Sequence, residues 1–112
     1  MRDAKRIASI LNDLDESLGD AAELVSRGRA AFDHDLAVRL AFEALSNRVG
    51  EACKRLVQLD AASFSEEIWA LAAKNRDKIV HHYALIDYDV LWGTVAQAFP
   101  QLRDLARTKR QR

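Results

Sequence analysis

VRLAFEALSNRVGEACKRL, residues 38–56, is a stretch whose apolar side chains recur every three or four positions. That spacing places them on one side of an α-helix, because a helix turns about 100° per residue. The stretch contains no proline and a single glycine, Gly50. It therefore predicts a long amphipathic helix with one buried face. The residues of that face are Val38, Ala41, Phe42, Leu45, Val49, Ala52, Cys53 and Leu56.

The same periodicity continues on the N-terminal side of this helix. Apolar residues at helical spacing predict a helix over residues 2–27, and Gly28 is a typical residue for ending it. Residues 28–35 are expected to form a connection from which Phe32 reaches into the core. Asp35 is expected to cap the helix that follows, because aspartate is a preferred N-cap residue.

A third helix is expected on the C-terminal side, because residues 60–65 break the apolar pattern and a new pattern then begins. It should run from about residue 64 or 65 to residue 82. Ser63 and Glu66 have the Ser-x-x-Glu spacing of a capping box, and Ser65 is a competing N-cap.

The last helix is expected to begin near Asp87 or Asp89, after a short loop over residues 84–88. Pro100 lies within its apolar pattern and should kink or break it, because proline lacks the N–H that the helix needs. Four helices joined by short loops predict an all-α fold, an antiparallel four-helix bundle with the last helix kinked or broken near Pro100.

The composition fits one domain, which we expect over residues 1–108, followed by a basic tail over residues 109–112. Of the 112 residues 49% are hydrophobic and 30% are charged, and the formal net charge is zero. A zero balance gives no overall attraction to nucleic acid, so any such site must be local. Residues 103–112 carry five basic side chains and one acidic one. This segment is expected either to guide RNA or to be an inert charged end.

Cellular location is predicted from what the sequence lacks. Cys53 is the only cysteine, so no disulfide can form within the chain. We find no apolar segment with the length of a signal peptide or a membrane span. We therefore expect a soluble, cytoplasmic protein without a membrane partner.

The segment with the most chemistry is KNRDKIVHHY, residues 74–83. Arg76 and Tyr83 are seven positions apart and share a helix face, and Asp77 and His81, four apart, share the neighbouring face. Asp77 is therefore placed to orient the His81 ring and favour its charged form. Arg76 and His81 are about 140° apart around the helix. They converge only if the helix end is distorted or if a second subunit contributes.

This set of side chains suits cleavage of an RNA phosphodiester without a metal. His81 can exchange protons with the 2′-hydroxyl or the leaving 5′-oxygen, and Arg76 can hold the phosphate. Lys74 and Lys78 are candidates for further phosphate contacts, although a solvated helix face explains them equally well. No metal site is expected, because His81 and His82 face different ways and no cysteine or carboxylate cluster accompanies them.

The motif Arg76-x4-His81-x-Tyr83 resembles the signature of HEPN domains, specifically the HepT-like ribonuclease toxins of the type VII toxin–antitoxin system. The resemblance covers roughly residues 32–102. The other matching features are Phe32, the helix Leu40–Leu56 with Gly50-Glu51-Ala52, Trp69, Trp92, Pro100 and Leu102.

The resemblance implies a metal-independent endoribonuclease that needs no cofactor and acts as a homodimer, with two motifs meeting in the dimer cleft. It implies that Arg76 and His81 are the catalytic pair and that Asp77 orients them. It also implies a minimal nucleotidyltransferase antitoxin as a partner, which transfers AMP onto Tyr83. The family commonly has asparagine where this chain has Asp77, and an acid there either holds His81 more firmly or partly neutralises Arg76.

Two other classes of function stay open at this point. One is a non-catalytic helical partner, or substrate-binding subunit, of a nucleotidyltransferase. The other is a structural dimerisation domain, for which substitutions at His81 and Tyr83 would be silent.

Overall fold

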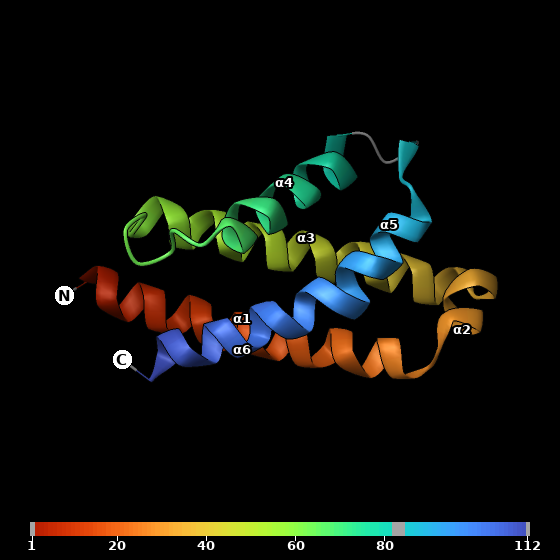
Figure 1. Cartoon of the computed structure of the whole chain (residues 1–112), viewed down its shortest axis with the longest axis horizontal. Helices are drawn as coiled ribbons and strands as arrows, with labels where there is room; N and C mark the ends of the chain where they lie inside the picture. The colour runs from red at the N-terminus through yellow and green to blue at the C-terminus, as the bar shows by residue number, and fades with distance from the viewer. Residues whose placement is uncertain (1, 82–84, 112) are drawn as a thin grey trace.

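The protein is an antiparallel bundle of long helices in the computed structural model, which describes residues 2–81 and 85–111. Successive long helices run back and forth along the long axis, so the N- and C-terminal ends lie at the same end of the bundle (Figure 1). None of the helices within the described residues is long and apolar enough to cross a lipid bilayer. The α-helices are α1 (Arg2–Ser26), α2 (Arg29–His34), α3 (Leu36–Leu59), α4 (Glu67–His81), α5 (Tyr88–Gly93) and α6 (Phe99–Arg110).

The connection between the first two long helices contains more structure than the sequence predicts. Gly28 follows α1 with a φ of 91°, a value that favours glycine, and the chain then forms the short helix α2. Phe32, on α2, is fully buried, as expected. Asp35 caps α3, because its side chain accepts a hydrogen bond from the Ala37 N–H at 2.9 Å. The prediction of a plain connection was wrong because burial of Phe32 holds this segment in a helical turn.

The start of the third long helix was also predicted incorrectly. α4 begins at Glu67 rather than at residue 64 or 65, and the Ser63–Glu66 capping box does not form. The Ser63 hydroxyl donates instead to Asp60 at 2.7 Å. The Glu66 carboxylate accepts from the Trp69 Nε1–H and from Lys109, both at 2.9 Å. Both members of the expected box are therefore bound elsewhere.

The break in the last helix is confirmed and takes the form of a π-helical turn. Asp87 caps α5 by accepting from the N–H groups of Asp89 and Val90. Between α5 and α6 the turn Thr94–Ala98 widens, so that the Phe99 N–H donates to the carbonyl of Thr94, five residues back. Pro100 sits in the first turn of α6, where a missing N–H is tolerated.

α3 is the central helix, since it packs against both α1 and α4 while α6 packs against α1 (Figure 1). Aromatic side chains join the elements at the α2 end of the core. The rings of Phe32 and Phe42 lie 4.6 Å apart, and Phe42 stacks on Trp92 at 5.6 Å. Cys53, also in the core, is fully buried, which raises the pKa of its thiol to about 12. It is a packing residue, as expected.

Basic side chains hold α6 against the rest of the bundle. Arg103, Arg107 and Arg110 all contact the Asp15 carboxylate of α1, at 3.4, 3.0 and 3.4 Å. Burial raises the pKa of Asp15, but hydrogen bonds from Arg107 and Arg103 outweigh this effect and lower the pKa overall. At the other end of α4 from the histidine motif, Lys109 pairs with Glu66.

The Glu66 contacts predict an acid-dependent loss of stability. Hydrogen bonds from Lys109 and Trp69 lower the pKa of Glu66 from 4.5 to about 2. A lowered folded-state pKa contributes stability that is complete above pH 4.5 and is lost as the pH falls toward 2. We expect Glu66→Gln to lower the free energy of urea unfolding at pH 7 by less than about 1 kcal/mol, because the pair is partly exposed. The difference from wild type should shrink between pH 4.5 and pH 2.

The control for this measurement is Glu67→Gln. It removes the charge of the neighbouring carboxylate, which makes no ion pair within the described chain. Its free energy of unfolding should follow the wild-type pH profile. If both variants gave the same pH dependence, the Lys109–Glu66 contact would not be the cause.

Candidate active site

The Arg76 guanidinium is held by three side chains. Its Nε–H donates to the Asn47 side-chain oxygen at 3.0 Å, and its Nη1–H donates to Asp77 at 3.0 Å. Its Nη2 lies 3.6 Å from a carboxylate oxygen of Glu51, close enough for an ion pair. The Arg76 side chain keeps 22% of its surface exposed. The arrangement fixes the direction of a cation that solvent can still reach.

Gly50 of α3 creates the space for Arg76. A Cβ atom at position 50 would lie 2.1 Å from the Arg76 Cβ and 2.7 Å from the carbonyl oxygen of Ala72. α4 can therefore cross α3 at this point only because position 50 has no side chain. Asn47 and Glu51 lie on either side of Gly50 along α3, and the close crossing brings both to the Arg76 side chain.

Asp77 contacts Arg76, so it orients the arginine of the predicted catalytic pair. The expected contact from Asp77 to His81 involves a side chain outside the described ones. His81 itself is the last residue of α4, which is α-helical from Glu67. Tyr83 lies outside the described residues, as does His82.

Lys74 and Lys78 lie on a different side of α4 from Arg76. Both line a groove of about 350 Å³ between α4 and the α5–α6 segment, together with apolar residues that include Val90 and Phe99. The structure therefore does not bring these lysines together with Arg76 within one chain. Their role as phosphate contacts stays a prediction.

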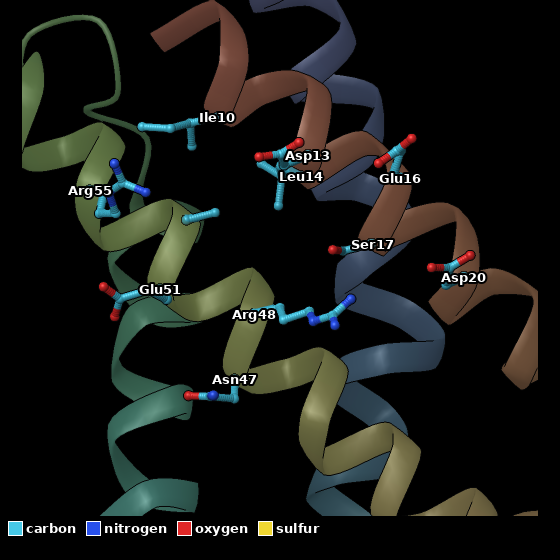
Figure 2. A pocket seen from close by; sticks show the side chains of 11 residues that line it. Ile10, Asp13, Leu14, Glu16, Ser17, Asp20, Asn47, Arg48, Glu51 and Arg55 are labelled. Atoms are coloured by element: carbon cyan, nitrogen blue, oxygen red, sulfur yellow. The ribbon is translucent and has the colours of Figure 1, made fainter. Parts of the chain in front are cut away.

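A second groove of about 440 Å³ runs between α1 and α3, and its lining includes two of the residues that contact Arg76. Asn47 and Glu51 lie at its α4 side, and Arg48 extends across it toward α1 (Figure 2). Arg55 lines it one turn further along α3. Sequence reasoning did not assign a role to any of these four residues. The one sign in the sequence was that Asn47 and Glu51 lie close to Gly50. Contacts between two helices cannot be predicted from the sequence of one of them.

Within residues 2–81 and 85–111 no three histidine, cysteine, aspartate or glutamate side chains gather where they could hold a metal ion. The polar groups that the structure describes at the site are the Arg76 guanidinium, the Asp77 and Glu51 carboxylates and the Asn47 amide.

An all-α bundle whose third long helix ends on an Arg-x4-His motif defines the class of HEPN proteins. The family model described as Ribonuclease HepT-like matches residues 14–108. The chain belongs to this family.

Curated relatives agree with this assignment. A Methanocaldococcus jannaschii protein named as a candidate RNase is 35% identical over 52 residues, 46% of this chain and 43% of the relative. A Caldanaerobacter subterraneus protein, also named as a candidate RNase, is 33% identical over 54 residues, 48% of each chain. A probable ribonuclease HepT of Thermococcus cleftensis is 36% identical over 55 residues, 49% of this chain and 50% of the relative. Each match thus spans half of the relative's length or less, and no solved structure matches the chain significantly.

The close crossing at Gly50 gives a stability prediction. We expect Gly50→Ala to lower the free energy of unfolding by about 1–3 kcal/mol, because α4 must move away from α3 to accommodate the new methyl group. Urea unfolding followed by circular dichroism measures this difference.

Gly93→Ala is the matched control, since Gly93 has helical backbone angles and no atom lies within 4 Å of a Cβ built there. This variant should be more stable than wild type, by up to about 1 kcal/mol, because alanine favours helix over glycine. A Gly50→Ala protein as stable as wild type would contradict the close crossing.

Proposed function

We propose that this protein is a metal-independent endoribonuclease, the toxin of a toxin–antitoxin pair, in which Arg76 and His81 act on the RNA phosphodiester. The observation that carries the proposal is the fixed Arg76 guanidinium. It is aimed by Asn47 and Asp77, stays partly open to solvent, and lies five residues before His81 on one helix. Membership of the HepT-like family supports the same activity.

In the proposed reaction His81 takes the proton from the ribose 2′-hydroxyl, whose oxygen attacks the adjacent phosphorus. The bond from phosphorus to the 5′-oxygen breaks, and that oxygen takes a proton from water. The products are a 2′,3′-cyclic phosphate and a 5′-hydroxyl. Proton transfer by a placed histidine contributes about 10²–10⁴-fold to such rates. Arg76 stabilises the negative charge that develops on the phosphate oxygens.

We propose that the active enzyme is a homodimer, because Arg76 and His81 do not face each other on one helix. α4 is α-helical through His81, so the two residues stay about 140° apart around it. The regular helix supports the second subunit, rather than a distorted helix end, as the source of the missing group. A second copy related by a two-fold axis brings its own motif to the same cleft.

The surface beside Arg76 favours such a dimer. Leu36 and Leu40 of α3 are 60% and 53% exposed, and they continue the helix face that carries Asn47 and Glu51. Further exposed apolar side chains follow the motif in the chain, at Leu85 and Val90. Exposed apolar surface next to a polar site is typical of an interface.

We further propose that a minimal nucleotidyltransferase antitoxin neutralises the toxin by modifying Tyr83. The tyrosine oxygen attacks the α-phosphorus of ATP, the bond to the β-phosphate bridging oxygen breaks, pyrophosphate leaves, and the phenolic proton passes to solvent. The AMP adduct adds a bulky anion two residues from His81. It blocks the cleft and repels RNA phosphate.

The proposed activity predicts RNA cleavage in EDTA by the purified, unmodified protein. Wild type should cleave single-stranded RNA or tRNA, and the products should carry 2′,3′-cyclic phosphate ends. Arg76→Ala and His81→Ala should each lower the rate at least 100-fold while circular dichroism shows unchanged helix content. Cleavage that persists in both variants would contradict the assignment. No cleavage by wild type, with Tyr83 free of AMP by mass spectrometry, would favour the non-catalytic partner of a nucleotidyltransferase.

The proposed dimer face predicts that Leu40→Asp yields monomers with greatly reduced cleavage, because a buried aspartate would disrupt the interface. Sedimentation velocity measures the oligomeric state. Leu71→Asp is the matched control, since Leu71 is also 53% exposed but lines the groove that faces α5 and α6. This control should remain dimeric. If Leu71→Asp gave monomers and Leu40→Asp did not, the dimer interface would lie on the side of α4 that faces α5 and α6.

A further inference from the structure

We infer that Asn47 and Glu51 of α3 are positioning residues that set the direction and availability of the Arg76 guanidinium. Asn47 aims the guanidinium, and Glu51 occupies the place that a substrate phosphate takes. The inference rests on the proposed function, in which Arg76 binds the phosphate of RNA. Neither residue belongs to the Arg-x4-His motif, and both lie on a different helix from it.

Asn47 controls the orientation of the guanidinium plane. A guanidinium has five N–H donors in a rigid planar fork, so fixing one edge fixes the others. The Nε–H donates to Asn47 and the Nη1–H donates to Asp77, both at 3.0 Å, which holds the fork at two of its three nitrogens. Loss of Asn47 leaves the arginine side chain free to rotate about its remaining contacts.

Glu51 contacts the third nitrogen only loosely. The distance of 3.6 Å from Nη2 to the carboxylate exceeds that of a hydrogen bond, and 48% of the Glu51 side chain is exposed. Nη2 therefore keeps donor capacity for a phosphate oxygen. A phosphate that binds there must displace the Glu51 carboxylate or tolerate its negative charge, because both anions compete for one cation.

Asn47 and Glu51 also border the groove between α1 and α3, at its α4 side (Figure 2). Arg48 and Arg55 line this groove together with Asp13, Glu16 and Asp20, so Glu51 is one of four carboxylates there. A phosphate that approached Arg76 from this side would meet their negative charge.

The two residues should affect catalysis in opposite directions, which separates them from residues that only stabilise the fold. Asn47→Ala should lower kcat by about 10- to 100-fold, because a misdirected catalytic group costs rate rather than affinity. Asn47→Asp retains an oxygen acceptor for the Nε–H and should recover much of that loss. Glu51→Gln should lower KM by about 2- to 5-fold, the range expected for a half-exposed charge pair.

The experiment combines steady-state cleavage of a fluorescent RNA with NMR of the side-chain Nε–H of Arg76, assigned by its disappearance in Arg76→Lys. Binding of the guanidinium to Asn47 protects this proton from exchange with water. Asn47→Ala should speed its exchange, and Asn47→Asp should restore protection. Glu16→Gln is the charge control, because Glu16 lines the same groove on α1. Its KM should change less than that of Glu51→Gln.

The NMR measurement does not depend on RNA cleavage, so the proposed ribonuclease activity and the proposed role of Asn47 can fail separately. One outcome is that wild type does not cleave RNA, while its Nε–H is protected from exchange and loses this protection in Asn47→Ala. That result would overturn the proposed ribonuclease activity and keep the contact between Asn47 and Arg76. Active wild type whose kcat and Nε–H exchange are unchanged in Asn47→Ala would overturn the positioning role of Asn47. An unchanged or raised KM in Glu51→Gln would overturn the competition with phosphate.

Discussion

The crossing of α4 over α3 at Gly50 sets the position of Arg76 and of the two α3 side chains that contact it. A side chain at this position would overlap the Arg76 Cβ and the Ala72 carbonyl. Because the backbones approach so closely, the base of Arg76 is fixed against α3, and the guanidinium at its outer end is held by Asn47 and Asp77. Asn47 and Glu51 then lie within reach of the guanidinium without any special loop. The absence of a side chain at Gly50 thus lets two packed helices hold the Arg76 guanidinium in a fixed position.

Charge is distributed so that the basic side chains of α6 serve the fold. Three arginines of α6 meet on Asp15, and Lys109 meets Glu66. These contacts lie near the C-terminal end of the chain, whereas α4 carries the motif toward the opposite end of the bundle (Figure 1). The basic C-terminal segment is therefore neither free nor close to His81 within one chain. For the proposed binding of RNA, Arg76 is the partly exposed cation of the site, because the groove that Arg48 and Arg55 line also carries four carboxylates.

The helices and their apolar faces could be predicted from the sequence because each depends on spacing within one segment. The 38–56 face, the Asp35 cap and the break ahead of Pro100 are local features of this kind, and all three are confirmed. The Ser63–Glu66 box was wrong because Lys109, 43 residues away, and Trp69 bind the glutamate. A capping box predicted from local sequence does not form when the fold brings a stronger hydrogen-bond partner to one of its residues.

The candidate site likewise combines local features that could be predicted with contacts between helices that could not. Arg76 was predicted as a functional residue from its spacing to His81, and its partner Asp77 is adjacent in sequence. Asn47 and Glu51 could not be predicted, because their contacts depend on how closely two helices cross, which the sequence signals only through Gly50.

The regular geometry of α4 also limits how one chain can act. A catalytic arginine and histidine must meet on the same phosphate, yet residues five apart on a straight helix point about 140° apart. α4 stays helical to His81, so flexibility of its end before that residue cannot resolve the mismatch. In the proposed homodimer, two-fold symmetry resolves this mismatch, because each copy contributes the same contact and completes the site of the other. The exposed leucines on the Asn47–Glu51 face of α3 give such pairing an apolar contact beside the cation. This face of α3 is exposed at Leu36 and Leu40, and it is the face to which the second copy binds in the proposed homodimer.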